Sequence, residues 1–136
     1  MKRFLGLLLL LVFCSCWSRP CRVADSIPPP PCKAMGSNSE GWRIATGICR
    51  DLEATGAEVE MASVNGTHLE LRFRPAFGQQ LLADEAALRQ TVAEFLSIIS
   101  RQTGSIRVSV EVFSGDTAIA IGEISRAGED RIELLP

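Results

Sequence analysis

A single histidine, His68, is the side chain best suited to acid–base chemistry, because imidazole is the group most often used as a general acid or base in enzymes. It lies in the alternating stretch "THLELRFR", where His68, Glu70 and Arg72 fall on one face of a strand. Beside a carboxylate, His68 would act as the general base of a hydrolase. No Ser-His-Asp or Cys-His arrangement is indicated, and "SGDTAIAIG" lacks the Lys-Ser/Thr of a phosphate-binding loop. We therefore expect a solvated polar face and no enzyme.

That polar face is expected to collect charged side chains from two hairpins: Glu58, Glu60, His68, Glu70, Arg72, Arg74, Arg107 and Glu111. If Arg72, Arg74 and Arg107 converge in a concave pocket, the face would suit a cell-wall fragment or another small ligand. A flat, evenly solvated face would count against that alternative.

The first residues of the chain have the pattern of an export signal. Lys2 and Arg3 precede an apolar run over residues 4–13. A helix that spans a bilayer needs about 20 apolar residues, so this run is too short to be a permanent span. A positive start followed by a short apolar core is typical of a signal peptide.

The residues after this core resemble the lipobox of bacterial lipoproteins. Phe13-Cys14-Ser15-Cys16 places a small residue directly before Cys16, although Phe13 and Cys14 depart from the commonest lipobox residues. The resemblance implies that residues 1–15 are removed, that Cys16 is diacylated, and that the lipid holds the protein on a bacterial membrane, on its periplasmic or surface side. The alternative is cleavage between residues 15 and 19 without lipid.

Three cysteines remain for disulfide chemistry in an oxidising compartment: Cys21, Cys32 and Cys49. A Cys21–Cys32 bridge would close a short loop, leaving Cys49 as a buried thiol on a helix. A Cys32–Cys49 bridge is the competing pairing. Their spacing does not fit a zinc site, and we expect neither a metal nor another cofactor.

Composition narrows the class of partner. Without Lys2 and Arg3 the 14 basic residues become 12 against 16 acidic ones, a net charge near −4, and the basic residues are dispersed. Nucleic-acid binding, which needs concentrated positive charge, is disfavoured. The run Pro28 to Pro31 favours polyproline II, so residues 16–38 are expected to form a semi-rigid tether.

Residues 39–136 are expected to form one α+β domain. Ser37 and Glu40 make a capping-box pattern, and a helical apolar stripe follows as far as Gly56. A second helix should begin after Asp84 and end at Gly104. Its apolar stripe comprises Leu88, Val92, Phe95, Leu96 and Ile99.

Each helix is followed by a predicted hairpin. A three-residue loop at Val64–Gly66 would pair Met61 with Leu69, and a two-residue loop at Gly115-Asp116 would set Ile119 opposite Val112. The predicted fold is therefore αββαββ, a four-stranded antiparallel sheet with two helices on one face. A short final strand is predicted over residues 132–134.

Residues 69–112 are similar in apolar pattern to the strand–loop–helix–strand opening of OmpA-like peptidoglycan-binding domains. That family continues with a further helix after an Asp-containing loop, with an Arg that helps to bind the wall peptide. Here Val112 leads into a tight hairpin, so the resemblance implies no binding residue in this chain.

Together these patterns indicate a small exported lipoprotein that displays a non-catalytic interaction module to an envelope protein. The stretch "AFGQQLL" is expected to be a loop whose Phe77, Leu81 and Leu82 contact that partner. The alternative places these side chains over the seam between helix and sheet. Binding of a cell-wall component or small ligand, and hydrolysis by His68, are the competing functions.

Overall fold

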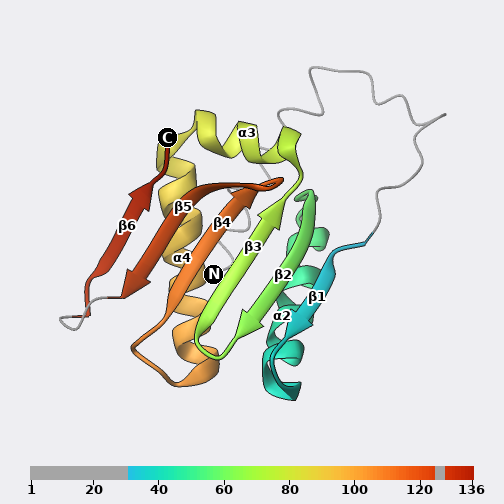
Figure 1. The fold of residues 1–136 in the computed structure, drawn as a ribbon, viewed down its shortest axis with the longest axis vertical. Coiled ribbons are helices and arrows are strands. Elements are labelled where there is room, and N and C mark those ends of the chain that lie inside the picture. The colour runs from blue at the N-terminus through green and yellow to red at the C-terminus, as the bar shows by residue number, and fades with distance from the viewer. Residues whose placement is uncertain (1–30, 125–127) are drawn as a thin grey trace.

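The computed structural model describes residues 31–124 and 128–136, which form a mixed sheet with helices packed on one of its faces (Figure 1). The elements in chain order are β1 (Lys33–Gly36), α2 (Ser39–Ala54), β2 (Val59–Asn65), β3 (His68–Phe73), α3 (Pro75–Ala83), α4 (Glu85–Thr103), β4 (Ser109–Ser114), β5 (Thr117–Ile124) and β6 (Asp130–Leu134). The six strands lie side by side in sequence order. The pairs β1/β2 and β3/β4 are parallel, and the other neighbours are antiparallel.

The predicted four-stranded antiparallel sheet with two helices is therefore wrong. The helices that follow β3 return the chain to the end of the sheet where β3 began, so β4 runs parallel to β3. Hairpin pairing alone gives no sign of such a crossover. The predicted final strand is confirmed and extends over β6, while β1 was not predicted at all.

Strand β1 moves the boundary of the domain into the predicted tether. Residues 33–36 were assigned to the tether, yet they pair in parallel with Met61 to Val64 of β2. Gly36 allows the chain to turn tightly into α2, because a Cβ at this position would lie 2.1 Å from the backbone nitrogen of Trp42. The folded unit thus begins before residue 39.

A disulfide closes this corner of the fold. It joins Cys32, directly before β1, to Cys49 on the buried side of α2. The backbone N–H of Cys32 also donates to Oε1 of Glu53 at 2.6 Å. The expected Cys21–Cys32 bridge and free Cys49 are thus replaced by the competing pairing, because β1 places Cys32 beside α2. Cys21 lies outside the described residues.

Two helices begin and end close to their predicted positions. Asn38 rather than Ser37 caps α2, and its side chain accepts from the N–H of Gly41 at 2.8 Å. Asp84 caps α4 as predicted, accepting from the N–H of Ala87 at 3.1 Å. Gly104 ends α4 with φ of 69°, a left-handed conformation that suits glycine. The predicted apolar stripe of α4 is buried.

The stretch predicted as a contact loop is a helix, α3. Pro75 stands in its first turn, where a missing N–H costs nothing and the fixed φ favours the helix. Phe77 and Leu81 are buried, Leu82 packs in part against the core, and the ring of Phe77 lies 5.1 Å from that of Phe73. The alternative in which these side chains cover the seam is therefore correct.

Both hairpins have two-residue loops and a bulge. In the first, Asn65 pairs with His68, and this register sets Met61 opposite Arg72, so the predicted Met61–Leu69 pair is wrong. A bulge between Val59 and Met61 then lets Val59 point into the core. In the second, the predicted Gly115-Asp116 loop is confirmed, with φ of 58° at Gly115. A bulge between Val112 and Phe113 sets Ala120, not Ile119, opposite Val112.

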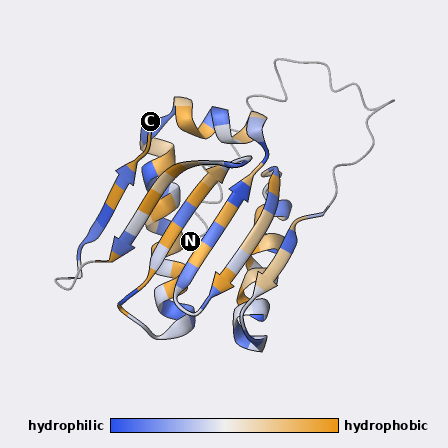
Figure 2. Ribbon diagram, in the orientation of Figure 1, coloured by the Kyte–Doolittle hydropathy of each residue, from blue (hydrophilic) through white to orange (hydrophobic). Residues whose placement is uncertain are grey.

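The core lies between the sheet and its three helices. Alternate strand residues point into it, as the alternating colours along β3 indicate in Figure 2. The fully buried strand side chains are Ala62, Val64, Leu69, Leu71, Phe73, Val110 and Val112. Because α2 covers β1 and β2 while α4 covers β4 to β6, this packing leaves the opposite side of the sheet uncovered by the described helices.

Candidate interaction surface

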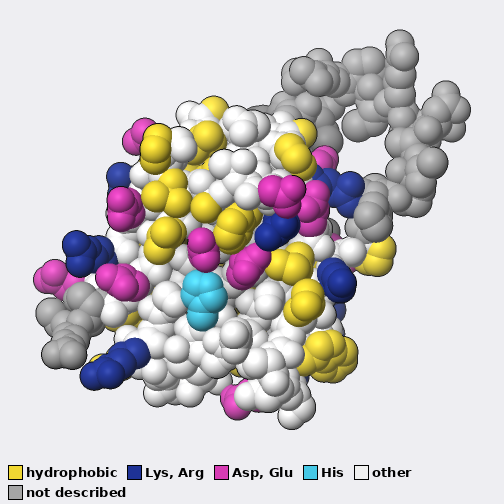
Figure 3. All heavy atoms as spheres, in the orientation of Figure 1, with side chains coloured by type: hydrophobic (Ala, Val, Ile, Leu, Met, Phe, Trp, Pro, Cys, Tyr) yellow, Lys and Arg dark blue, Asp and Glu magenta, His cyan; other side chains and the backbone are white. Residues whose placement is uncertain are grey.

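The side of the sheet that faces away from the helices is the candidate functional surface, and we call it the open face. Strand alternation and register place these residues on it: Lys33, Met35, Met61, Ser63, His68, Glu70, Arg72, Ser109, Glu111, Phe113, Ala118, Ile121, Glu123, Arg131 and Glu133. Figure 3 views the molecule from this side and shows hydrophobic side chains gathered beside charged ones near its centre. The open face is therefore neither a uniformly polar nor a uniformly apolar surface.

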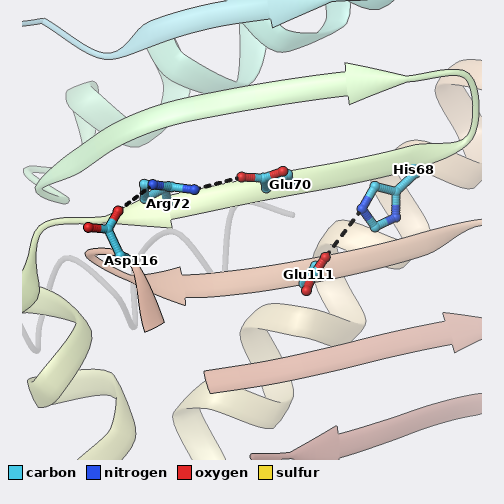
Figure 4. Close-up of polar contacts among 5 residues, drawn as sticks. All are labelled: His68, Glu70, Arg72, Glu111 and Asp116. Carbon is cyan, nitrogen blue, oxygen red and sulfur yellow. Dashed lines mark hydrogen bonds and ion pairs between the residues drawn. The ribbon is translucent and has the colours of Figure 1, made fainter. Parts of the chain in front are cut away.

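Arg72 makes most of the polar contacts in one half of the centre of the open face. Its Nη1 donates to Oδ1 of Asp116 at 2.7 Å, and its Nη2 donates to Oε1 of Glu70 at 3.0 Å (Figure 4). Its Cζ lies 5.1 Å from the centroid of the Phe113 ring, a cation–π distance. With two carboxylates on one guanidinium, the charge of Arg72 is compensated within the protein.

His68 makes the polar contacts in the other half of the centre of the open face. Its Nδ1 lies 2.7 Å from Oγ of Ser109, within hydrogen-bond reach. Its Nε2 lies 3.6 Å from Oε2 of Glu111, which is longer than a hydrogen bond but close enough for ion pairing of a protonated imidazole (Figure 4). The His68 side chain retains 41% exposure. It is thus an accessible group on the surface of the sheet.

The order Ser109, His68, Glu111 superficially resembles a nucleophile, base and orienting acid. The Glu111 contact is too long to fix the ring by a hydrogen bond. Strand N–H groups point along the sheet to neighbouring strands, as that of Ser109 does to the carbonyl of Thr67 at 3.1 Å, so they supply no oxyanion hole above the face. The geometry favours polar cross-strand contacts over catalysis.

The three arginines considered for a ligand pocket are spread along the sheet. Arg74 follows the end of β3, whereas Arg107 precedes the start of β4, and β3 and β4 run in the same direction. Arg74 and Arg107 therefore lie toward opposite ends of the central strand pair. The convergence required for the cell-wall or small-ligand alternative is not found.

Two carboxylates meet at the middle of the open face. Glu70 on β3 is the register partner of Glu111 on β4, so their side chains stand side by side on the same face. Each of these side chains is about 30% exposed. Like charges directly opposed across strands destabilise a sheet. This juxtaposition depends on the parallel β3/β4 pair, so the sequence pattern gave no signal for it.

Exposed apolar side chains flank this acidic pair. Ile121 of β5 is the register partner of Glu111 and is 39% exposed. Met61 and Phe113 adjoin Arg72 from opposite sides, and Met35 on the edge strand β1 is 42% exposed. The apolar and acidic groups are therefore interleaved across the middle of the sheet.

Cys16, the predicted acylation site, lies outside the described residues. Among residues 31–124 and 128–136, no group of three or more His, Cys, Asp or Glu side chains is placed to hold a metal ion. No helix within those same ranges is long and apolar enough to cross a membrane.

Comparisons with known proteins assign no family to this chain. No protein-family model matches it, and neither the curated proteins nor the solved structures contain a significant match. What the chain does must therefore be argued from its own residues.

Proposed function

We propose that this protein is an exported lipoprotein, held on a bacterial membrane by acylated Cys16, whose α+β domain is a non-catalytic interaction module for an envelope protein. The observation that carries the interaction role is the open face. It combines exposed Ile121 and Met35 with half-buried ion pairs on a sheet whose described helices pack on its other side. Such mixed surfaces, with apolar groups among polar ones, are typical of protein interfaces.

The Cys32–Cys49 disulfide supports the export part of the proposal. Disulfides persist mainly in oxidising compartments, and thiols in the cytoplasm of most bacteria are kept reduced. The bridge also sits where the chain from the N-terminus enters the domain. A domain that hangs from its N-terminal side is consistent with an anchor at Cys16.

The intact mass of the mature protein tests the anchor. We expect a chain that begins at Cys16 and carries a diacylglyceryl group, and we expect a Cys16→Ser protein to leave the membrane fraction. A mature chain that begins elsewhere without lipid would refute the anchor while leaving the domain's role open.

Chemical crosslinking in intact envelopes, followed by identification of the crosslinked peptides, tests the interaction role. Peptides from the open face joined to another envelope protein are the expected result. A lipidated protein that crosslinks only to itself or to nothing would refute the role of interaction module.

A further inference from the structure

We propose that the open face binds a basic amphipathic segment of its protein partner, with a Lys or Arg side chain of that segment directed at Glu70 and Glu111. This inference rests on the proposed interaction function and specifies the chemistry of the partner. It follows from the charge at the centre of the face, the apolar groups around it, and the exclusion of other occupants.

The centre of the open face carries excess negative charge. Glu70, Glu111 and Asp116 contribute three carboxylates, while Arg72 contributes one cation, so the cluster has a net charge of −2 with His68 neutral. Arg72 already contacts Glu70 and Asp116, so within the described part of the chain Glu111 has only the 3.6 Å contact to an imidazole. A cation supplied from outside would relieve the repulsion between the opposed Glu70 and Glu111.

The surroundings of this centre are suited to a segment with apolar side chains. Phe113 and Ile121 lie toward β5, and Met61 and Met35 lie toward β1. Methionine adapts its shape to different partners, and the Phe113 ring offers a flat contact. Apolar groups on both sides of a carboxylate pair match a segment whose basic residue lies within its apolar stripe. A segment of this kind would bury the apolar groups and, in the same contact, pair its basic side chain with the carboxylates.

Charge also excludes the alternative occupants. In a symmetric dimer formed through the middle of this face, the acidic centre of one copy would meet the same centre of the other. Anionic lipid headgroups and nucleic-acid phosphates would be repelled for the same reason. Parallel sheets are usually covered on both faces, and here the helices of the described residues cover the parallel β3/β4 pair on one side. A basic protein segment is the occupant that satisfies both the exposed apolar area and the charge.

The test is site-specific photocrosslinking of the full lipidated protein in its native envelope. A photoreactive residue replaces Ile121 or Met35 on the open face, or, as exposed hydrophobic controls outside the strands, Trp42 on α2 or Ile106 between α4 and β4. The crosslinked peptides are sequenced by mass spectrometry. The yield from Ile121 is then compared between the parent and the Glu70→Gln/Glu111→Gln variant, with Asp51→Asn/Glu94→Gln on the helices as a variant matched in charge.

We expect adducts from the open face only, in a protein segment that contains Lys or Arg among apolar residues. The Glu70→Gln/Glu111→Gln variant should lower the yield roughly tenfold while the domain stays folded at the temperature of the assay, and the matched variant should leave the yield unaltered. An acidic or neutral captured segment, adducts with lipid or with a second copy, or a yield insensitive to the glutamate changes would overturn this inference. These results differ from failure of the broader proposal, in which a lipidated protein gives no adduct from any position.

Discussion

Removal of the Cys32–Cys49 disulfide should destabilise the domain in a way that the structure lets us estimate. The perturbation is Cys32→Ala/Cys49→Ala, made in a Cys14→Ser/Cys16→Ser/Cys21→Ser parent so that no other thiol reacts. The bridge joins residues 17 positions apart. In the chain-entropy model, a loop of that length restrains the unfolded chain by about 3 kcal/mol.

This free energy translates into a large change in melting temperature. For a domain of about this size, 1 kcal/mol shifts the melting temperature by roughly 4–5 °C, so the variant should melt roughly 12–15 °C below its parent. The loss should also be local. Strand β1 has four residues and pairs with β2 only, so without the bridge its amides should exchange with solvent roughly tenfold faster.

Circular dichroism melting and hydrogen exchange of the two proteins measure these effects. Amides of the central strand β3 serve as the internal reference, because this strand is paired on both sides. A melting temperature within about 4 °C of the parent, or unchanged amide hydrogen exchange in β1, would refute the conclusion that the bridge stabilises the domain and holds β1 in the sheet. Peptide mapping of the natural protein that finds a Cys21–Cys32 bond would refute the pairing itself.

Three further changes test other parts of the structure. Gly78→Ala should lower the free energy of unfolding by about 1–3 kcal/mol in denaturant, because the new Cβ would lie 2.3 Å from the Ser114 hydroxyl. Gly47→Ala is the control: its Cβ would have nothing within 4 Å, so it should stabilise α2 by about 0.5–1 kcal/mol. Equal changes in unfolding free energy for the two variants would contradict the packing of α3. Asp84→Ala should cost about 1 kcal/mol in the same assay through loss of the α4 cap, and no change would show that the cap is dispensable. His68→Gln should keep every cellular phenotype, because glutamine retains a polar side chain on the open face and removes only the acid–base chemistry; loss of phenotype at unchanged stability would revive the hydrolase.

The parts of the fold that follow from local signals could be predicted from the sequence. Asn38 and Asp84 are followed by apolar stripes at helical spacing, and both helices form there. The Gly115-Asp116 turn is equally local. Pro75 is an ambiguous local signal, because proline can end a strand and is also favoured in the first turn of a helix, as it is in α3.

The parts that depend on long-range contacts could not be predicted. Strand β1 is four residues with no alternating pattern, and it becomes a strand only by pairing with β2. Bulges at Glu60 in β2 and Ile119 in β5 reverse the inward and outward positions beyond them, which defeats any register drawn from strict alternation. The parallel pairing of β3 with β4 has no local sequence signal comparable to the turn residues of a hairpin.

The same division applies to the candidate surface. The alternation in each strand correctly placed His68, Glu70, Arg72 and Glu111 on one polar face. That Glu70 and Glu111 are neighbours follows only from the order and direction of the strands. Phe77 and Leu81 were misplaced because a segment without periodicity was interpreted as an exposed loop, whereas α3 buries them.

Hydroxyl-radical footprinting of the protein in its native envelope, compared with the purified protein, tests the central claim most directly. The claim is that the open face is covered by a partner. It predicts that labelling of Met61, Phe113 and Ile121 falls in the envelope, while labelling of Trp42, which is 56% exposed away from that face, stays the same. Equal labelling of all four residues in both samples would contradict it.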